Sequence, residues 1–105
     1  MMKNNMETEM QTRKIVINTC FGGFSLSDKA LAMFADRAGL VLSQIFPWEI
    51  DRADPELVHV VEMLGKDANG SHARLKVVEI PADVAWKIEE HDGVEHIAEV
   101  HRTWW

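Results

Sequence analysis

The stretch KIVINTCFGGFSLS, residues 14–27, decides how the rest of the chain folds. It begins with a β-branched run over residues 15–17, which is typical of a buried strand. Gly22 and Gly23 interrupt this run, because glycine adopts positive φ angles without steric cost. Ser27 then stands at the N-cap position of a helix that begins at the next residue. The stretch therefore predicts a strand, a glycine turn and the start of a helix.

Length and composition indicate one small folded domain. The chain has 105 residues, of which 47% are hydrophobic. Its formal net charge of −6 is opposite in sign to the surface that binds nucleic acid or an anionic membrane. One cysteine allows no internal disulfide, which fits a reducing compartment. No apolar run is long enough to span a bilayer, and the first residues do not resemble a signal peptide. We therefore expect a cytoplasmic protein that binds neither nucleic acid nor membrane.

The chain divides at the start of the β-branched run. Residues 1–13 are polar and methionine-rich without a hydrophobic period, so we predict a disordered N-terminal tail. Residues 14–105 are predicted to form a single α+β domain in which two helices pack on a sheet. Its expected elements are a strand over 14–20, a helix over 28–38, a helix over 55–64, a strand over 75–80 and a C-terminal hairpin, and residues 40–45 are apolar enough for an optional further strand.

The ends of both helices carry specific signals. Ser27 and Asp54 are favourable N-cap residues, and Pro55 follows at the first helical position, where proline is well tolerated. Gly39 and Gly65 stand one position beyond the last apolar residue of each helix. The apolar stripes consist of Ala30, Met33, Phe34 and Ala38 in the first helix and of Leu57, Val60, Val61 and Leu64 in the second.

The segment over residues 86–101 fits either a hairpin or a helix broken at its glycine. We favour the hairpin, because the Asp-Gly pair at 92–93 lies between two alternating runs and suits a type I′ turn. The two-residue turn sets a register with facing pairs His91 and Val94, Glu90 and Glu95, Glu89 and His96, and Ile88 and Ile97.

Reactive and metal-binding chemistry has only weak signals. Cys20 precedes a helix start, where a thiol pKa can fall, but no base accompanies it and a small buried thiol is the plainer interpretation. Glu89, His91 and His96 share one face of the hairpin, yet their spacing matches no known metal site and a solvated Glu–His pair explains them. Glu90 and Glu95 would form an exposed acidic tip. We therefore predict no catalytic residue, no metal and no cofactor, and rank an enzyme last.

A small-ligand site is the alternative hypothesis for function, ranked behind protein binding. The N–H groups around Gly22, Gly23 and Ser25 could cradle an anion at the start of a helix. Arg52 and Arg102 could bind a phosphate through two parallel hydrogen bonds. Together these residues suggest a nucleotide-type ligand, although the glycines match neither a P-loop nor a dinucleotide-binding motif.

A protein-binding surface is the first hypothesis for function. Residues 89–99 hold five acids and no lysine or arginine, so Glu90, Asp92 and Glu95 would create a negative field, or a merely solvated face. Trp104 and Trp105 end the chain beside an arginine, a combination enriched at interfaces. Trp86 is expected to pack in the core beside Ile88.

Three segments resemble a widespread family of short uncharacterised proteins from tailed phages and prophages. They are the opening KIVINTCFGGFSLS, the middle DPELVHVVEMLG and the closing IEEHDGVEHIAEVHRTW. The resemblance covers most of the chain after residue 13 and carries no catalytic residue over. It implies an accessory protein that binds host machinery or blunts host defence, by occupying a host protein or sequestering a nucleotide signal. We therefore expect binding to a host protein or self-association as a homodimer.

Overall fold

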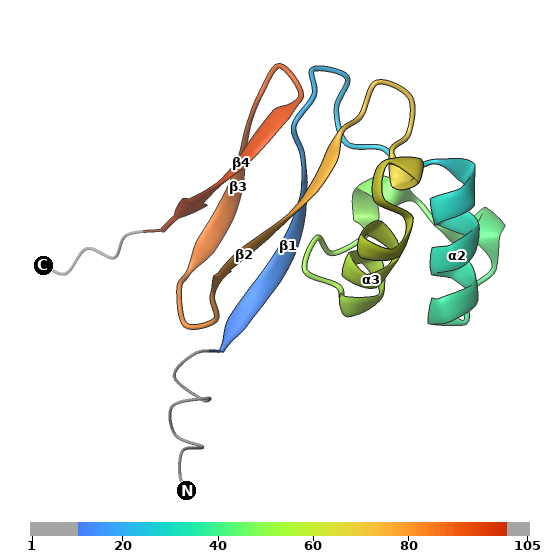
Figure 1. The fold of residues 1–105 in the computed structure, drawn as a ribbon, viewed down its shortest axis with the longest axis horizontal. Coiled ribbons are helices and arrows are strands. Elements are labelled where there is room, and N and C mark those ends of the chain that lie inside the picture. The colour runs from blue at the N-terminus through green and yellow to red at the C-terminus, as the bar shows by residue number, and fades with distance from the viewer. Residues whose placement is uncertain (1–10, 101–105) are drawn as a thin grey trace, which may run out of the picture.

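Two antiparallel β-ribbons and two α-helices make up the fold, which confirms the α+β class (Figure 1). The structure is a computed structural model that describes residues 11–100. Its elements are β1 (Thr12–Asn18), α2 (Asp28–Ala38), η1 (Leu42–Gln44), η2 (Pro47–Glu49), α3 (Pro55–Leu64), η3 (Gly65–Ala68), β2 (Leu75–Pro81), β3 (Trp86–His91) and β4 (Val94–Glu99).

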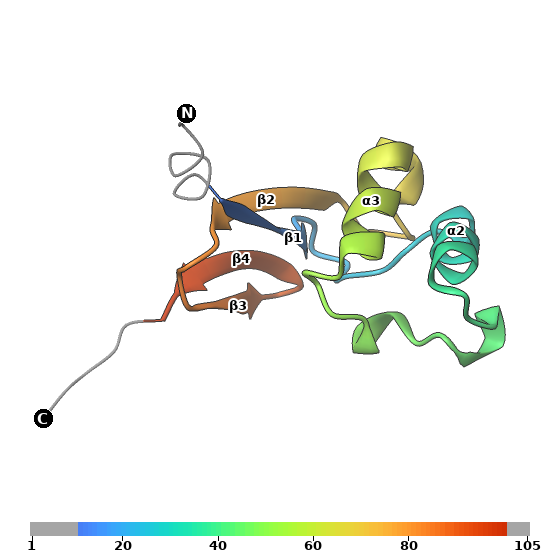
Figure 2. The ribbon, with the colours of Figure 1, turned by 90° about the horizontal axis from the view of Figure 1, so that it is seen from below.

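The strand β1 is the centre of the molecule. It pairs with β2, with Val16 opposite Val77, and its middle residues are buried on both faces. Val16 belongs to the core beneath the helices, whereas Ile15 and Ile17 are buried outside that core cluster, and alternation places them on the other face of the strand. The second ribbon lies against β1 (Figure 2). Burial on both faces explains why the run is apolar without alternation.

The boundaries of β1 differ from the prediction. The strand begins at Thr12 rather than residue 14, so Thr12 and Arg13 belong to the sheet and not to a tail. It ends at Asn18 rather than at Cys20, because the Asn18 side chain binds the chain that follows and turns it away. Gln11 precedes the strand, and residues 1–10 of the predicted tail lie outside the described residues.

Both helices have their predicted bounds and caps. The Ser27 hydroxyl accepts the Ala30 N–H at 3.0 Å, and a left-handed Gly39 ends α2. The Asp54 carboxylate accepts the Glu56 N–H at 2.8 Å at the start of α3. The helix α3 lies directly on β1 and β2, and α2 packs against the outer side of α3 (Figure 1). The core residues are Val16, Leu26, Ala30, Phe34, Leu57, Val58, Val60, Val61 and Ala68.

The optional strand predicted over residues 40–45 is wrong. The segment forms the short 3-10 turn η1, in which the Gln44 N–H donates to the Val41 carbonyl and the Ile45 N–H to the Leu42 carbonyl. These local bonds satisfy the backbone without a partner strand, and Pro47 then starts a second turn, η2. Local turns thus replace the expected strand.

The C-terminal hairpin is confirmed, and the helical alternative is wrong for residues 86–99. All four predicted facing pairs occur in the register of β3 and β4. Asp92 and Gly93 both have positive φ, 54° and 88°, as a type I′ turn requires. Trp86 is only partly buried and lines a hollow with Ile80 and Ile97 rather than filling the core.

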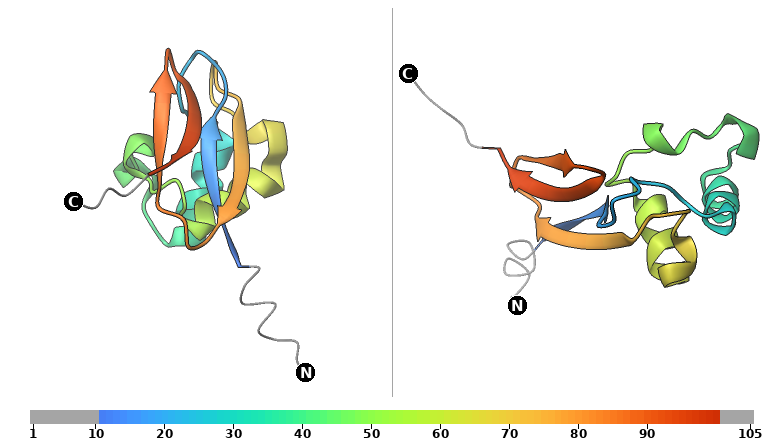
Figure 3. Two further views of the ribbon diagram at one scale, coloured as in Figure 1. Left: turned by 90° about the vertical axis from the view of Figure 1, so that its left-hand side faces the viewer. Right: turned by 90° about the horizontal axis from the view of Figure 1, so that it is seen from above.

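The hairpin forms its own ribbon instead of extending the first one. Within residues 11–100, β1–β2 and β3–β4 are separate two-stranded sheets, and β4 lies against β1. Figure 3 shows the two ribbons at one end of the molecule and the helices at the other. Contacts between side chains and backbone, rather than a continuous ladder, must therefore hold the ribbons together.

Candidate interaction surface

A largely buried ion pair between Arg52, in the loop before α3, and Glu95 of β4 connects the hairpin to β1, because Arg52 also bonds to Val16. Nη1 of Arg52 lies 2.6 Å from Oε1 of Glu95, and Nη2 lies 2.9 Å from Oε2, so the pair is bidentate. The same guanidinium donates to the Val16 carbonyl at 3.3 Å and lies over the Phe24 ring at 3.7 Å. The Nη1–Nη2 edge, through which the guanidinium could bind a phosphate with two hydrogen bonds, is therefore occupied by Glu95. Arg52, predicted as a ligand-binding residue, instead supports the fold.

Asn18 also connects the two ribbons, a role that the sequence did not predict. Its side-chain amide donates to the carbonyls of Cys20 and Gly93 at 2.6 and 2.7 Å. Its side-chain oxygen accepts the N–H groups of Cys20 and Arg74 at 3.3 and 2.9 Å. Its own backbone N–H donates to Glu95 at 2.9 Å. One fully buried residue thus connects β1, the glycine turn, β2 and the hairpin tip.

The glycine turn packs against the chain's own backbone. A Cβ on Gly22 would lie 2.1 Å from the Cβ of His72, so this glycine permits a close approach between two loops. A Cβ on Gly70 would lie 2.2 Å from Oγ of Ser25, and that hydroxyl donates to the Ser71 carbonyl. The predicted ligand residues of the turn therefore have packing contacts of their own. Arg102, the other arginine predicted for this site, lies outside the described residues.

The predicted acidic surface is smaller than expected. Glu90 and Asp92 are exposed at the hairpin tip, where the Glu90 carboxylate accepts the Gly93 N–H. The exposed position expected for Glu95 is wrong, since its side chain is 8% exposed and paired with Arg52. Trp104 and Trp105, the other predicted partner residues, lie outside the described residues.

Glu89 and His96 face each other as the register predicted. Their side chains lie 3.0 Å apart, and Lys87 lies 3.2 Å from the same carboxylate. The hydrogen bonds from Lys87 and then from His96 hold the pKa of Glu89 below its ordinary value of 4.5. Among residues 11–100, no group of three or more histidine, cysteine, aspartate or glutamate side chains could hold a metal ion.

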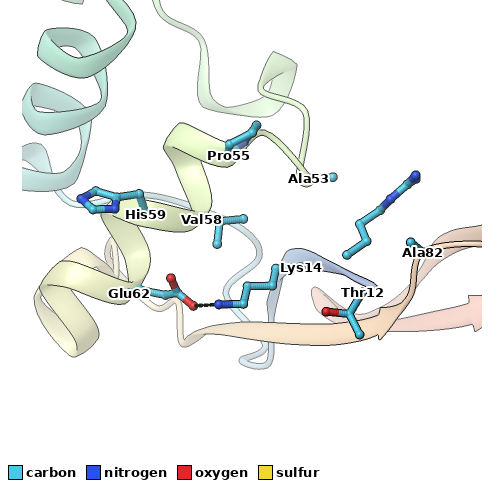
Figure 4. A pocket seen from close by; sticks show the side chains of 9 residues that line it. Thr12, Lys14, Ala53, Pro55, Val58, His59, Glu62 and Ala82 are labelled. Atoms are coloured by element: carbon cyan, nitrogen blue, oxygen red, sulfur yellow. Dashed lines mark hydrogen bonds and ion pairs between the residues drawn. The ribbon is translucent and has the colours of Figure 1, made fainter. Parts of the chain in front are cut away.

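A hollow of about 490 Å³ lies between β1 and α3 (Figure 4). One wall is formed by Thr12, Arg13 and Lys14, and the other by residues of α3. Nζ of Lys14 reaches across it to Oε2 of Glu62, 2.9 Å away, and this bond raises the pKa of Lys14. Lys14 and Arg13 make this hollow, rather than the glycine turn, the more open setting for an anionic ligand.

Five exposed large apolar side chains lie within residues 40–48, a segment that we call the apolar arm. It runs along the outside of the helices between α2 and α3 (green in Figure 2). Its large apolar side chains are between 45% and 74% exposed, and the rings of Phe46 and Trp48 lie 5.3 Å apart. The exposed side chains are Leu40, Val41, Leu42, Phe46 and Trp48. Only Ile45 within the arm and Ile50 beyond it pack against the core.

No residue of this arm was among the partner-binding residues predicted from the sequence. The sequence shows that the arm is apolar, but an apolar run of this length is compatible with a buried strand as well as with an exposed turn. Exposure is a property of the folded chain, so only the structure separates the two. The arm now stands as the candidate interaction surface.

Comparisons with known proteins add no evidence about this surface. No protein-family model, no curated protein and no solved structure matches the chain. In the part of the chain that the structure describes, no helix has the length and apolar character needed to cross a membrane.

Proposed function

We propose that this protein acts by binding another protein through the apolar arm, without catalysing a reaction. The observation that supports the proposal is the concentration of five exposed large apolar side chains within residues 40–48. Exposed apolar residues are ordinary when scattered, whereas a contiguous patch typically marks an interaction site. Trp48 adds an aromatic side chain of the kind that dominates interface energetics.

The arm is suited to docking because it is held in place. Two 3-10 turns satisfy part of its backbone, and Ile45 and Ile50 anchor it to the core. An anchored segment loses less conformational entropy on binding than a flexible one, so more of the apolar burial contributes to affinity. The resemblance to phage accessory proteins implies that the partner is a host protein and that binding interferes with host defence.

The test is capture of host cytosolic proteins on the intact chain and on two variants. The arm variant Phe46→Ser/Trp48→Ser removes the apolar contact, and Phe21→Ser removes an equally exposed aromatic ring outside the arm. We expect a partner that binds the wild type and Phe21→Ser with similar affinity and binds the arm variant at least about tenfold more weakly. Equal retention of every captured protein by the arm variant would exclude the arm as the binding surface. Thermal unfolding of each variant shows whether its fold is intact.

A small-ligand function is the second candidate, and the hollow between β1 and α3 favours it. Its volume of about 490 Å³ lies within the range of small-molecule sites, and Arg13 and Lys14 line it. We expect a nucleotide-type ligand to raise the melting temperature of the wild type and to lose that effect in Lys14→Ala. A flat response across nucleotides and inorganic phosphates would eliminate this candidate.

A further inference from the structure

A small hollow with an apolar floor and an acidic rim opens at the base of the apolar arm. Its volume is about 240 Å³, and it lies between the arm and the start of α3. Phe34, Ile45 and Ile50 provide apolar lining, and Phe34 also belongs to the buried core. This volume is below the roughly 300 Å³ at which small-molecule sites begin, so the hollow suits a single side chain of a partner rather than a free ligand.

The rim of this hollow carries Glu49, Asp51 and Asp54. Among the described residues, none of these carboxylates forms an ion pair with a lysine or arginine. The Asp54 carboxylate caps α3 by accepting the Glu56 N–H, and Oδ1 of Asp51 accepts the Ala53 N–H. Glu49 is exposed beside the exposed Trp48, so negative charge and apolar surface occur together.

We infer that this hollow receives an apolar side chain from a basic segment of the partner protein. The inference rests on the proposed binding function and names the chemistry of the partner. An apolar anchor would fill the floor formed by Phe34, Ile45 and Ile50, and flanking lysines or arginines would lie against the carboxylate rim. A second copy of this chain is a poor occupant, because its formal charge of −6 would be brought against the same acidic rim.

Synthetic peptides test the chemistry of the occupant directly. The probe is a 12-residue peptide, about the length of a docking segment, with a central Leu-Phe-Leu flanked by lysines and arginines. One comparison peptide replaces the flanks with glutamates, and another replaces the apolar centre with serines. We expect the basic apolar peptide to shift the amide NMR signals of Phe34, Ile45 and Ile50, and the other two to bind at least about tenfold more weakly. Binding should also weaken as salt is raised from about 0.05 to 0.5 M.

Two charge-matched variants locate the effect on the protein. Glu49→Gln/Asp51→Asn removes two rim charges and keeps the side-chain oxygen that accepts the Ala53 N–H. Asp83→Asn/Glu99→Gln removes the same net charge from exposed positions elsewhere. We expect the rim variant to bind the basic peptide about tenfold more weakly and the control variant to bind it as the wild type does.

Each other outcome overturns the inference. Failure of the basic peptide to bind, equal binding of the acidic peptide, or equal weakening in both charge variants would exclude a basic partner at this rim. A dimer in analytical ultracentrifugation that is lost in Phe46→Ser/Trp48→Ser would make a second copy the occupant. If the host protein is lost by that arm variant but kept by the rim variant, the proposed function stands and this inference fails. If the arm variant keeps it, the proposed function itself fails.

Discussion

At the scale of single residues, the fold depends on polar side chains that are buried although side chains of these types are usually exposed. Asn18 and Glu95 are the buried polar residues of the described chain, and each bonds to more than one segment. A buried polar group is tolerated when its hydrogen bonds are made, and it becomes costly when one partner is removed. No buried side-chain nitrogen or oxygen among residues 11–100 lacks a partner, so this requirement is met.

Alanine substitutions at Gly23 and Gly93 allow the cost of backbone strain to be measured apart from the cost of a steric clash. Gly23 and Gly93 share a φ of 88°, but a Cβ on Gly93 would lie 2.3 Å from the Phe21 carbonyl oxygen, whereas nothing lies within 4 Å of one on Gly23. We expect Gly23→Ala to lower the free energy of unfolding by about 1 kcal/mol, the cost of a left-handed alanine. Gly93→Ala should cost about 3 kcal/mol or more, because the hairpin tip must also move away.

Chemical denaturation of both variants measures this difference. The shared φ makes Gly23→Ala the control for the backbone term. Equal losses of stability in the two variants would mean that the close contact between the hairpin tip and the glycine turn is absent in solution.

At the scale of elements, the hairpin is the clearest case of local signals deciding structure. Its Asp-Gly turn sets the register, and the register then places Glu89 opposite His96. The capped helices follow the same logic, because a cap residue and the turn that it closes are neighbours in sequence. Such elements could be predicted without knowledge of the rest of the chain.

The lowered pKa of Glu89 makes the hairpin sensitive to acid. Lys87 and His96 favour the ionised carboxylate, so its pKa in the folded chain lies below the ordinary 4.5. The stabilisation is therefore present above pH 4.5 and is lost as the pH falls through the lower folded value. We expect an NMR titration of Glu89 to show this lowered pKa and Lys87→Ala to bring it back toward 4.5. An unchanged titration curve in Lys87→Ala would contradict the assignment of Lys87 as the main cause.

At the scale of the whole molecule, the ribbons are joined by side chains instead of a continuous ladder. The edge of β1 that does not pair with β2 meets the Arg52 backbone, the Arg52 guanidinium and the Glu95 carboxylate. These groups satisfy the N–H and C=O groups that an unpaired edge would expose. The hairpin therefore docks through a small polar junction, and that junction should govern how readily it separates from the helices.

We expect the Arg52–Glu95 pair to stabilise the fold far more than an exposed pair does. Glu95→Gln leaves the Arg52 charge without its partner and should lower the free energy of unfolding by about 3 kcal/mol. The replacement keeps an oxygen for the Asn18 N–H, so the loss reports the ion pair. A double-mutant cycle with Arg52→Met measures the coupling between the two side chains.

The exposed pair Arg37–Glu56 is the matched control, because its closest contact is also 2.6 Å. Its side chains are 40% and 38% exposed, against 19% and 8% for Arg52 and Glu95, so its coupling should stay below about 1 kcal/mol. Hydrogen exchange in Glu95→Gln should accelerate most in β3 and β4. Equal coupling in the two cycles would show that the buried pair does not hold the ribbons together.

The α+β class, the bounds of α2 and α3 and the register of the hairpin could be predicted from the amino-acid order, because caps, helical periodicity and a two-residue turn act between near neighbours. The inward turn of Glu95 toward Arg52 and the exposure of the large apolar side chains in the arm could not be predicted in this way. Alternation assigns side chains to a face, but it does not say which face another segment will cover. The apolar segment could have been a buried strand, and the acidic hairpin could have been fully solvated. The contact with the distant Arg52 decides the burial of Glu95, whereas the 3-10 hydrogen bonds within residues 41–45 decide that the apolar segment forms turns.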